Sequence, residues 1–586
     1  MKIRMGRTSN ILLWFASAAV LAVVGFDDAM PQPSAIAVHG GAGRVSGSLS
    51  IMTLQGSAFM IDCGSYYPDG DGTPEANRLD ASRLSATLPL GAESVSAVFL
   101  THPHIDHIGR IPLLVKRGYK GPIYLREGSE PIAIAMLTGQ VRYQSSSPRS
   151  WRWSTNSNSN KEGKVPVRTL HWRDDCEWSQ RISPSNVKTF EGTWDEVERE
   201  LNQKFSGGSP CKTCAKVELL PVCKLLRPVQ IEQTIEIGST RITPQSAGHV
   251  PGAVSYLFEV VEGDRTSRVV FSGDLGNGRS TTIGAAAPCP SADIVFCETT
   301  YACSPPAVSS FEDDMAAFRN AVAVATASGG IAWIPAFAFD RTQKVLIEIS
   351  KAKRNGQVSM KTSVYCPSPT AHKCTEAYEA PSNPLNLPNS LANDLRLLKP
   401  DGYHEQLPDA VNEFLDEEKA LKLQGKRKPS GPDAGRLAAL TSLRGNILVT
   451  TSGMVDEVFS RSLLEPLISE GTVTVFLVGY QDPGSPGGRL EAAGKEQRKT
   501  IVVDGLELPL NAKVEKFTGF SAHSSGRDID QWLVGVNKKA RVFLVHGGES
   551  QLEERLKCLQ SAGWESVSVA KMDQPIPLFP KDVVGK

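Results

Sequence analysis

The stretch that decides the fold is Thr101-His-Pro-His-Ile-Asp-His-Ile-Gly109, which contains three histidines and one aspartate, His102, His104, Asp106 and His107. The residues before it, 92–101, are rich in apolar and β-branched side chains, which is typical of a buried strand. His102 and His104 point to the same side of an extended segment, and a tight turn then brings Asp106 and His107 to a second position. Neutral imidazoles and a hard carboxylate at this spacing predict a site for Zn²⁺ or a similar divalent ion.

Length and composition limit the class of protein. A chain of 586 residues is too long for one core, so we expect two or three domains. The 63 Lys and Arg residues balance the 63 Asp and Glu residues, which excludes a protein-wide positive field, so any polyanion must bind in a local groove. The number of cysteines, 11, is odd, so at least one has no intrachain partner.

The N-terminus has the layout of a secretory signal. Lys2, Arg4 and Arg7 precede an uncharged apolar run, residues 11–25, with small residues near its end. The run is short for a membrane span, which needs about 20 apolar residues. The first 25 residues therefore predict a signal peptide or an N-terminal anchor, and an exported protein that touches a membrane only if this segment stays uncleaved. The alternative is a misassigned start and a cytoplasmic protein.

Polar side chains recur at the ends of later apolar runs. Each one alone is more often structural than functional, and their significance comes from their order after the first motif. These candidates are His249, Asp274, Glu298, His523 and His546.

The first motif, followed by His249, Asp274 and His546 in this order, resembles the metallo-β-lactamase fold. Glu298 and four later stretches, 330–346, 364–371, 447–454 and 475–489, resemble the β-CASP branch of that fold. The resemblance implies an α/β protein, with a metallo-β-lactamase αββα sandwich and an inserted α/β domain whose sheet is largely parallel.

The resemblance also divides the chain. The first part of the metallo-β-lactamase domain is expected at 34–303, the β-CASP domain at 304–490, and the returning part of the first domain at 491–586. Residues 139–230 are expected to be an irregular insertion. It contains Cys176, Cys211, Cys214 and Cys223, which could form disulfides or hold a structural zinc.

Site roles follow from the resemblance. His102, His104 and His249 would hold one divalent ion, and Asp106, His107 and His546 would hold a second. Asp274 would be shared, and both ions are expected to be Zn²⁺. We assign catalysis to Asp106, Glu298 and His523, with Glu298 keeping His523 protonated as the general acid. Substrate binding is expected from Ser272, Arg341 and Ser452, with Phe337 and Phe339 available to stack on bases.

These expectations favour a metal-dependent hydrolase that cleaves single-stranded RNA, as an endonuclease or a 5′-exonuclease. A DNA nuclease of the same branch is the first alternative, but DNA-acting members typically have valine at the position of His546. A catalytically inactive scaffold is the second, although such proteins lose several ligands. A small-molecule hydrolase would not need the inserted domain. No nucleotide cofactor is expected, and a homodimer stays open.

Four departures from the family pattern are visible. Asp340 stands where glycine is usual, Val455 begins a segment that replaces a glycine pair, Ser525 replaces an aspartate, and two glycines follow His546. None removes a ligand candidate, so the departures bear on substrate geometry.

Overall fold

The computed structural model describes residues 33–54, 57–67, 74–145, 151–155, 168–172, 215–303, 310–382, 385–399, 402–423, 433–456, 458–503 and 505–579. The expected leader, and Cys176, Cys211 and Cys214, lie outside these residues. Among the helices of the described residues, none combines the length and the apolar character needed to cross a membrane.

The first sheet has seven strands of mixed direction. Its order is β24 (Ile576–Pro577), β1 (Ala35–Gly40), β2 (Leu49–Leu54), β3 (Ser57–Ile61), β4 (Val95–Phe99), β5 (Ile123–Arg126) and β8 (Leu226–Val229). β1, β2 and β3 pair as antiparallel hairpins, whereas β3, β4, β5 and β8 are parallel. The parallel strands end on one edge of the sheet, so the motif that follows β4 lies on that edge.

The second sheet also has seven strands. Its order is β23 (Val567–Val569), β22 (Arg541–Val545), β13 (Ile294–Glu298), β12 (Arg265–Phe271), β11 (Val254–Glu262), β10 (Thr240–Ser246) and β9 (Ile235–Ile237). It packs face to face on the first sheet through a core rich in aromatic rings, where Phe99 meets Phe258 at 5.2 Å between ring centroids. Successive side chains of β4 point to opposite faces of the sheet. Phe99 faces the core shared by the two sheets, and Val98 faces the core beneath the helices that cover the first sheet.

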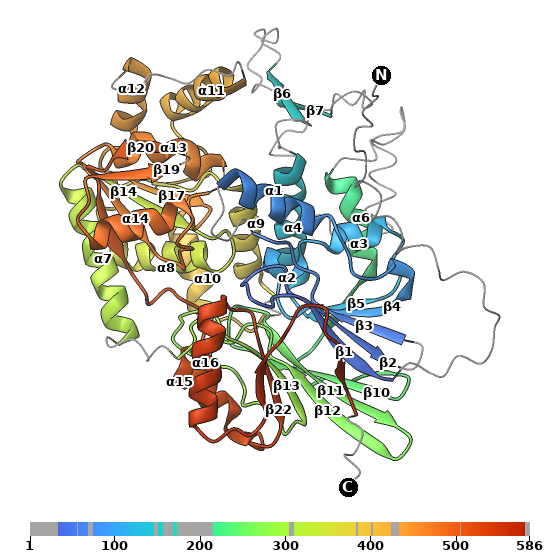
Figure 1. The fold of residues 1–586 in the computed structure, drawn as a ribbon. Coiled ribbons are helices and arrows are strands. Elements are labelled where there is room, and N and C mark those ends of the chain that lie inside the picture. Colours follow the sequence, from blue (N-terminus) through green and yellow to red (C-terminus); the bar gives the residue numbers. More distant parts are fainter. Residues whose placement is uncertain are drawn as a thin grey trace, which may run out of the picture.

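Helices cover both outer faces of the two sheets. The first sheet is covered by α2 (Ile105–Ile108), α3 (Ile111–Lys116), α4 (Glu130–Ser145) and α6 (Ala215–Leu225), and α1 (Pro74–Ser85) links β3 to β4. The second is covered by α15 (Gly526–Trp532) and α16 (Glu549–Ser561), seen over β13 and β22 in Figure 1. The αββα sandwich expected from the sequence is confirmed.

The inserted domain is built on a six-stranded sheet whose pairings are all parallel. Its order is β16 (Tyr403–His404), β15 (Val364–Tyr365), β17 (Ile447–Thr451), β14 (Ile331–Ala336), β18 (Val473–Leu477) and β21 (Lys513–Lys516). One face packs on α7 (Phe311–Ala327), α8 (Arg341–Arg354), α9 (Pro369–Tyr378) and α10 (Asn389–Leu398). The other packs on α11 (Asp409–Leu423), α12 (Ala434–Leu443), α13 (Val458–Ile468) and α14 (Pro486–Lys495). The inserted α/β domain is thus confirmed.

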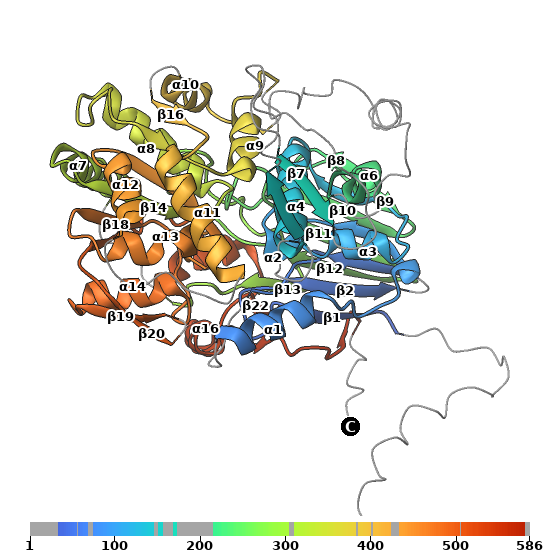
Figure 2. The ribbon, with the colours of Figure 1, turned by 90° about the horizontal axis from the view of Figure 1, so that it is seen from above.

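The two domains lie side by side, with α9 of the inserted domain packed on α4 of the first domain (Figure 2). Both domains contribute to one continuous hydrophobic core. It contains buried residues of β13 and β22 from the first domain and of α7 and α8 from the inserted domain. The edge of the sandwich that carries the histidine motif therefore faces the inserted domain.

The strand pairing extends past two expected domain boundaries. The sheet of the inserted domain continues beyond residue 490, since β21 pairs with β18 from Lys513 to Lys516 and the hairpin of β19 (Thr500–Val503) and β20 (Leu506–Pro509) packs in the same core. The sequence 513–516 is mostly charged because it forms an exposed edge strand, so its pattern does not reveal the strand.

The insertion at 139–230 is also shorter than expected. Its first residues complete α4, and its last ones form α6 and β8, which belong to the first sheet. Between them the structure describes a small ladder of β6 (Trp151–Thr155) and β7 (Arg168–Trp172). Cys223 lies on α6 as a buried free thiol, so it forms neither a disulfide nor a zinc site with described residues.

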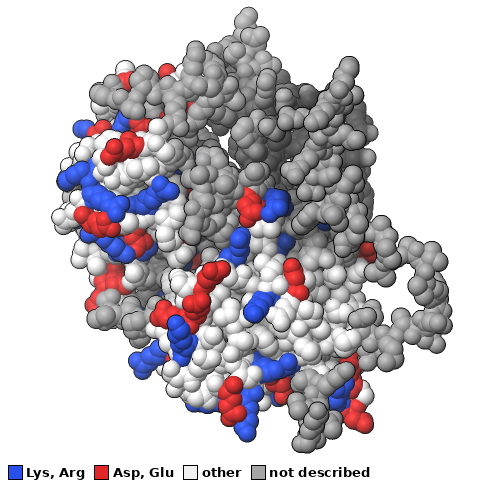
Figure 3. Space-filling view, in the orientation of Figure 1, with Lys and Arg blue, Asp and Glu red and all other residues white. Residues whose placement is uncertain are grey.

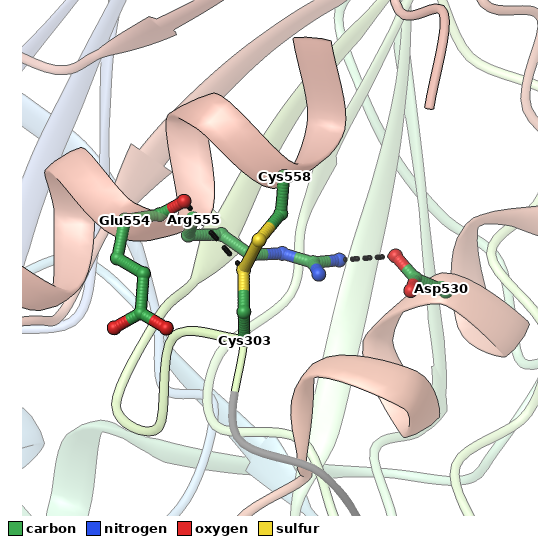
Figure 4. Close-up of a disulfide and its surroundings, with 5 residues drawn as sticks. All are labelled: Cys303, Asp530, Glu554, Arg555 and Cys558. Carbon is green, nitrogen blue, oxygen red and sulfur yellow. Dashed lines mark hydrogen bonds and ion pairs between the residues drawn. A yellow bond between two sulfur atoms is a disulfide. The ribbon is translucent and has the colours of Figure 1, made fainter. Parts of the chain in front are cut away.

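A disulfide joins Cys303 to Cys558 and was not expected from the sequence (Figure 4). It links the segment after β13 to α16, and the ion pair of Arg555 with Asp530, 2.7 Å long, links α16 to α15. The segments tied together in this way are those next to Glu298, His523 and His546.

Candidate metal centre

All seven predicted metal ligands meet at the edge of the sandwich where the strands end. They form two groups, and within each group the candidate ligand atoms lie within 4.8 Å of one another. The first group is His102, His104, His249 and Asp274, and the second is Asp106, His107 and His546.

Backbone contacts set the position of the histidine motif. After β4 the chain turns into the short helix α2, which contains Asp106 and His107. Cys63 N–H donates to the carbonyl oxygen of His107 at 2.7 Å, and Ser65 N–H donates to that of Ile105 at 2.9 Å. Between them Gly64 lies so close to the motif that a Cβ atom would fall 1.6 Å from the Asp106 carbonyl oxygen. The motif therefore rests on the turn after β3, and this close approach requires glycine.

Asp274 lies between the two groups. One oxygen, Oδ2, is 3.6 Å from His102 Nε2 and 3.7 Å from His249 Nε2. The other, Oδ1, is 3.3 Å from His107 Nε2 and 3.5 Å from His546 Nδ1. Since each oxygen faces a different group, this carboxylate is placed to be shared by two cations.

Unpaired buried atoms show that the donor set fits cations. Both ring nitrogens of His249, and Oδ1 of Asp274, are buried without a hydrogen-bond partner among the described residues. Such atoms are nearly always paired in folded proteins. Burial lowers the pKa of His249 and His102 well below the usual value, and lowers that of His104 to about 4. These imidazoles are therefore neutral, the form that ligates a metal.

A second layer of side chains, absent from the sequence-based site, orients the ligands. Asp62 Oδ2 accepts a hydrogen bond from His107 Nδ1 at 2.7 Å, and Thr101 donates to Asp62 from both its N–H and its hydroxyl. Thr300 Oγ1 lies 3.1 Å from His546 Nδ1. Partners of this kind fix the tautomer of a ligating imidazole. The available signal for Asp62 was its position at a strand end before a turn glycine.

Glu298 and His523 come together beside the two groups. Glu298 is fully buried, and its carboxylate accepts from Leu275 N–H at 2.9 Å and from Thr300 N–H at 3.0 Å. His523 Nδ1 lies 3.3 Å from Glu298 Oε1, and the opposite ring nitrogen, Nε2, lies 3.9 Å from Asp274 Oδ2. The side chain of His523 is 15% exposed, whereas Glu298 is not exposed at all. Glu298 is thus held by two backbone N–H groups, and it holds His523 with its opposite ring nitrogen toward Asp274.

The three predicted substrate-binding residues have different surroundings. The expectation that Ser272 binds substrate needs correction. Its hydroxyl donates to the Gly273 carbonyl oxygen at 2.6 Å and accepts from Glu298 N–H at 3.0 Å, so it supports Glu298. Ser452 caps its own loop, since its hydroxyl contacts Asp456 Oδ1 and accepts from Asp456 N–H. Arg341 is 8% exposed, and its Nε and Nη1 atoms have no hydrogen-bond partner among the described residues.

The two predicted stacking aromatics also differ. Phe339 is 1% exposed and packs edge-on against His104 at 5.5 Å, so it cannot stack on a base, which corrects the expectation. Phe337 is half-buried and lies across Gly453 and Gly479, where a Cβ atom would approach its ring to 2.8 and 3.3 Å. His39 lies outside both groups, with Nδ1 2.6 Å from Asp573 Oδ1.

The second group predicts a pH dependence of metal uptake. Burial alone would lower the pKa of His107 and His546, but the charge of Asp274, with Asp62 or Asp106, raises both above the usual value. The metal-free protein therefore keeps protons on these imidazoles to a higher pH than ordinary histidines do, and a cation must displace them. We expect the dissociation constant for Zn²⁺ to fall as pH rises. Calorimetric titration of metal-free protein in buffers of different ionisation enthalpy would show proton release, and pH-independent uptake would contradict it.

Three family models match most of the chain. The family models described as the metallo-beta-lactamase superfamily, the Beta-Casp domain and the Zn-dependent metallo-hydrolase RNA specificity domain match residues 42–295, 342–490 and 507–569. The chain is 25% identical over 550 residues to "Ribonuclease TTHA0252" of Thermus thermophilus, covering 93% of this chain and 100% of that protein.

Two other relatives extend the comparison. "Transcription termination factor FttA" of Methanosarcina mazei is 25% identical over 516 residues, covering 87% of this chain and 66% of that protein. "Cleavage and polyadenylation specificity factor 73" of Drosophila melanogaster is 22% identical over 523 residues, covering 89% and 61%. The chain thus spans the whole of the first relative and about two thirds or less of the other two.

Four observations point to the same family: the order of the ligand motifs, the αββα sandwich, the inserted parallel α/β domain and the three matching family models. The chain belongs to the β-CASP branch of the metallo-β-lactamase superfamily, in which its relatives include RNA-processing metallo-hydrolase nucleases.

Proposed function

We propose that the protein is a ribonuclease that cleaves single-stranded RNA with two divalent metal ions, and that these ions are Zn²⁺, which suits the imidazole and carboxylate donors of the site. The observation that carries the proposal is the complete pair of ligand groups with the Asp274 carboxylate between them. Seven ligands exceed the four that one tetrahedral zinc uses. The same completeness argues against a non-catalytic scaffold.

The chain's own residues divide the chemical work. Two bound divalent ions would supply an activated water and neutralise charge on the phosphate oxygens. Asp274 holds both ligand groups together. His523, oriented by Glu298 and partly exposed, would donate a proton to the leaving oxygen. Arg341, buried with unpaired nitrogens, would pair with a phosphate of the strand.

RNA is preferred to DNA in this proposal for two reasons. His546 belongs to the second ligand group, whereas DNA-acting members of the branch typically have valine there. The family model that matches residues 507–569 is described as an RNA specificity domain, and one relative that the chain spans in full is named a ribonuclease.

On the face shown in Figure 3, basic and acidic side chains are interspersed, as the balanced composition of the chain leads one to expect.

The direct test is cleavage of end-labelled single-stranded RNA and single-stranded DNA of the same sequence by the zinc-loaded protein. We expect RNA to be cleaved, DNA to be cleaved far more slowly, and a chelator to abolish both activities. The sizes of the labelled products separate internal from 5′-terminal cleavage. Equal or faster cleavage of DNA would contradict the preference, and a metal-loaded protein inactive on RNA would contradict the function.

We also propose that the protein works in an oxidising compartment after export. Two features support this: the signal-like first 25 residues, and the Cys303–Cys558 disulfide, a bond that persists mainly outside reducing cytoplasm. Protein isolated from its native host, with thiols blocked at lysis, should begin between Ala19 and Phe26 and contain the Cys303–Cys558 cross-link by peptide mapping. An intact Met1 together with free thiols at both positions would contradict export.

A further inference from the structure

The loop between β14 and α8 makes an unusual turn at Asp340, the position where the family pattern has glycine. The N–H of Arg341 donates to the carbonyl oxygen of Phe339 at 2.8 Å, while Asp340 adopts φ 62° and ψ −49°. This is a γ-turn with positive φ at its centre, a rare and strained conformation for a residue with a side chain. Such strain persists only where surrounding contacts hold it.

Contacts of the Asp340 carboxylate hold this turn. Oδ1 accepts hydrogen bonds from Thr282 Oγ1 at 3.0 Å and from Tyr378 OH at 2.8 Å, and Oδ2 lies 2.6 Å from Lys344 Nζ. Asp340 is 1% exposed and Lys344 is 3% exposed. The pair is therefore shielded from solvent, and neither charge can be removed alone without leaving the other buried and unpaired.

One of these hydrogen bonds crosses the boundary between the two domains. Thr282 belongs to the loop that follows Asp274 in the first domain, whereas Asp340 and Tyr378 belong to the inserted domain. This loop is also where a metal ligand is held, so the hydroxyl of Thr282 connects the inserted domain to the neighbourhood of the ligand groups.

The turn itself separates two functional neighbours. On one side, Phe339 packs against the ring of His104. On the other, Arg341 is the first residue of α8, and Nε and Nη1 of its buried guanidinium have no hydrogen-bond partner among the described residues. A change in the turn would thus alter the position of Arg341 relative to the metal ligands.

We propose that Asp340 is a positioning residue that fixes the inserted domain against the metal centre, so that Arg341 and the ligand groups engage the same RNA strand. This inference rests on the proposed function. RNA must contact both domains at once, whereas a small diester such as bis(p-nitrophenyl) phosphate needs the metal centre alone. Loss of the Asp340 contacts should therefore impair RNA cleavage selectively.

Thr282 provides the first test because it lies outside the catalytic groups. Thr282→Val keeps the side chain's shape and removes the cross-domain hydrogen bond, together with the contact of the same hydroxyl with Ser280 Oγ at 2.9 Å inside the loop, whereas Thr282→Ser keeps the hydroxyl. We expect kcat/KM for RNA to fall about 10-fold in Thr282→Val, the effect of losing the cross-domain hydrogen bond, mainly through a higher KM. Thr282→Ser should restore it, and hydrolysis of the small diester should stay within about twofold of wild type in both, well below the effect of one such bond.

A double variant separates positioning from stability. Asp340→Gly with Lys344→Met removes the carboxylate and its ammonium together, and glycine relieves the positive φ. We expect the Tm to equal or exceed the wild-type value, while KM for RNA rises and the small diester is hydrolysed normally.

The outcomes are distinguishable. Wild-type RNA kinetics in both Thr282→Val and the double variant would overturn the role of Asp340 and leave the proposed function intact. Equal losses on RNA and on the small diester would also overturn it, because the turn would then serve the metal centre alone. A wild-type protein that hydrolyses the small diester but not RNA would overturn both proposals.

Discussion

Replacement of His104 by alanine is expected to abolish hydrolysis of RNA and of small phosphodiesters, and to reduce the metal content of the protein. Wild-type protein purified without chelators should contain close to two ions per chain by elemental analysis, because two separate ligand groups are present. The variant loses one of four donors in the first group, and the remaining three include the shared Asp274. Activity should fall at least about 10³-fold, since metal activation of water and charge neutralisation are both lost.

The fold of His104→Ala should remain cooperative. His104 lies on a turn after β4 whose backbone is held by residues 63–65, so the side chain contributes to the site more than to the core. His404→Ala is a matched control, because His404 is an exposed histidine outside both groups. If the His104→Ala protein is unfolded at the growth temperature, the metal site stabilises the fold. If the variant keeps the wild-type metal content and activity, His104 is not a ligand.

Replacement of His523 by alanine is expected to slow RNA cleavage while both metals stay bound. His523 lies beside the ligand groups and belongs to neither, with Glu298 at 3.3 Å and an exposed fraction of 15%. Loss of a general acid typically costs about 10²–10⁴-fold, so the decrease in kcat should fall in this range. The deficit should shrink on a nitrophenyl phosphodiester, because a nitrophenolate leaves without a proton.

His546→Ala is the matched comparison for this experiment. Its ring belongs to the second ligand group, so this variant should lose metal and fail on both substrates equally. Equal losses on the two substrates in His523→Ala, or loss of metal there, would identify His523 as a ligand or a packing residue.

The resemblance to the metallo-β-lactamase fold predicted the fold and the ligand set, and two local sequence signals agree with it. Alternating apolar residues define the strands locally, because successive side chains point to opposite faces. A polar residue directly after such a strand must lie at the sheet edge, and His102, His104, His249, Asp274 and His546 all do. The inserted domain was expected from the resemblance of four stretches to the β-CASP branch, and its central strands are continuous apolar runs, as expected for strands buried on both faces.

Edges and insertions were less predictable. β21 is mostly charged because it borders solvent, so its membership of the inserted sheet depends on its pairing with β18 and not on its own pattern. β8 is a four-residue strand that follows α6 directly, and only its pairing with β5 shows that the first domain resumes there.

The roles of single polar residues depended on the tertiary structure. Ser272 and Phe339 were expected to contact substrate. In the structure the Ser272 hydroxyl accepts a hydrogen bond from Glu298 N–H, and Phe339 packs on His104. Asp62 supports His107 across 45 residues, and the Cys303–Cys558 disulfide spans 255. A local sequence pattern does not show which distant group a side chain will contact in the folded protein.

The sequence by itself determined where the apolar strand segments lie along the chain and which polar residues follow them, since strands show in short-range periodicity and turn chemistry. Only the tertiary structure decided that the two oxygens of Asp274 face different ligand groups, and that the strained turn at Asp340 is held by a hydroxyl from the other domain. The physical reason is that these contacts join segments brought together by sheet pairing and domain packing, and their geometry is set by non-local burial.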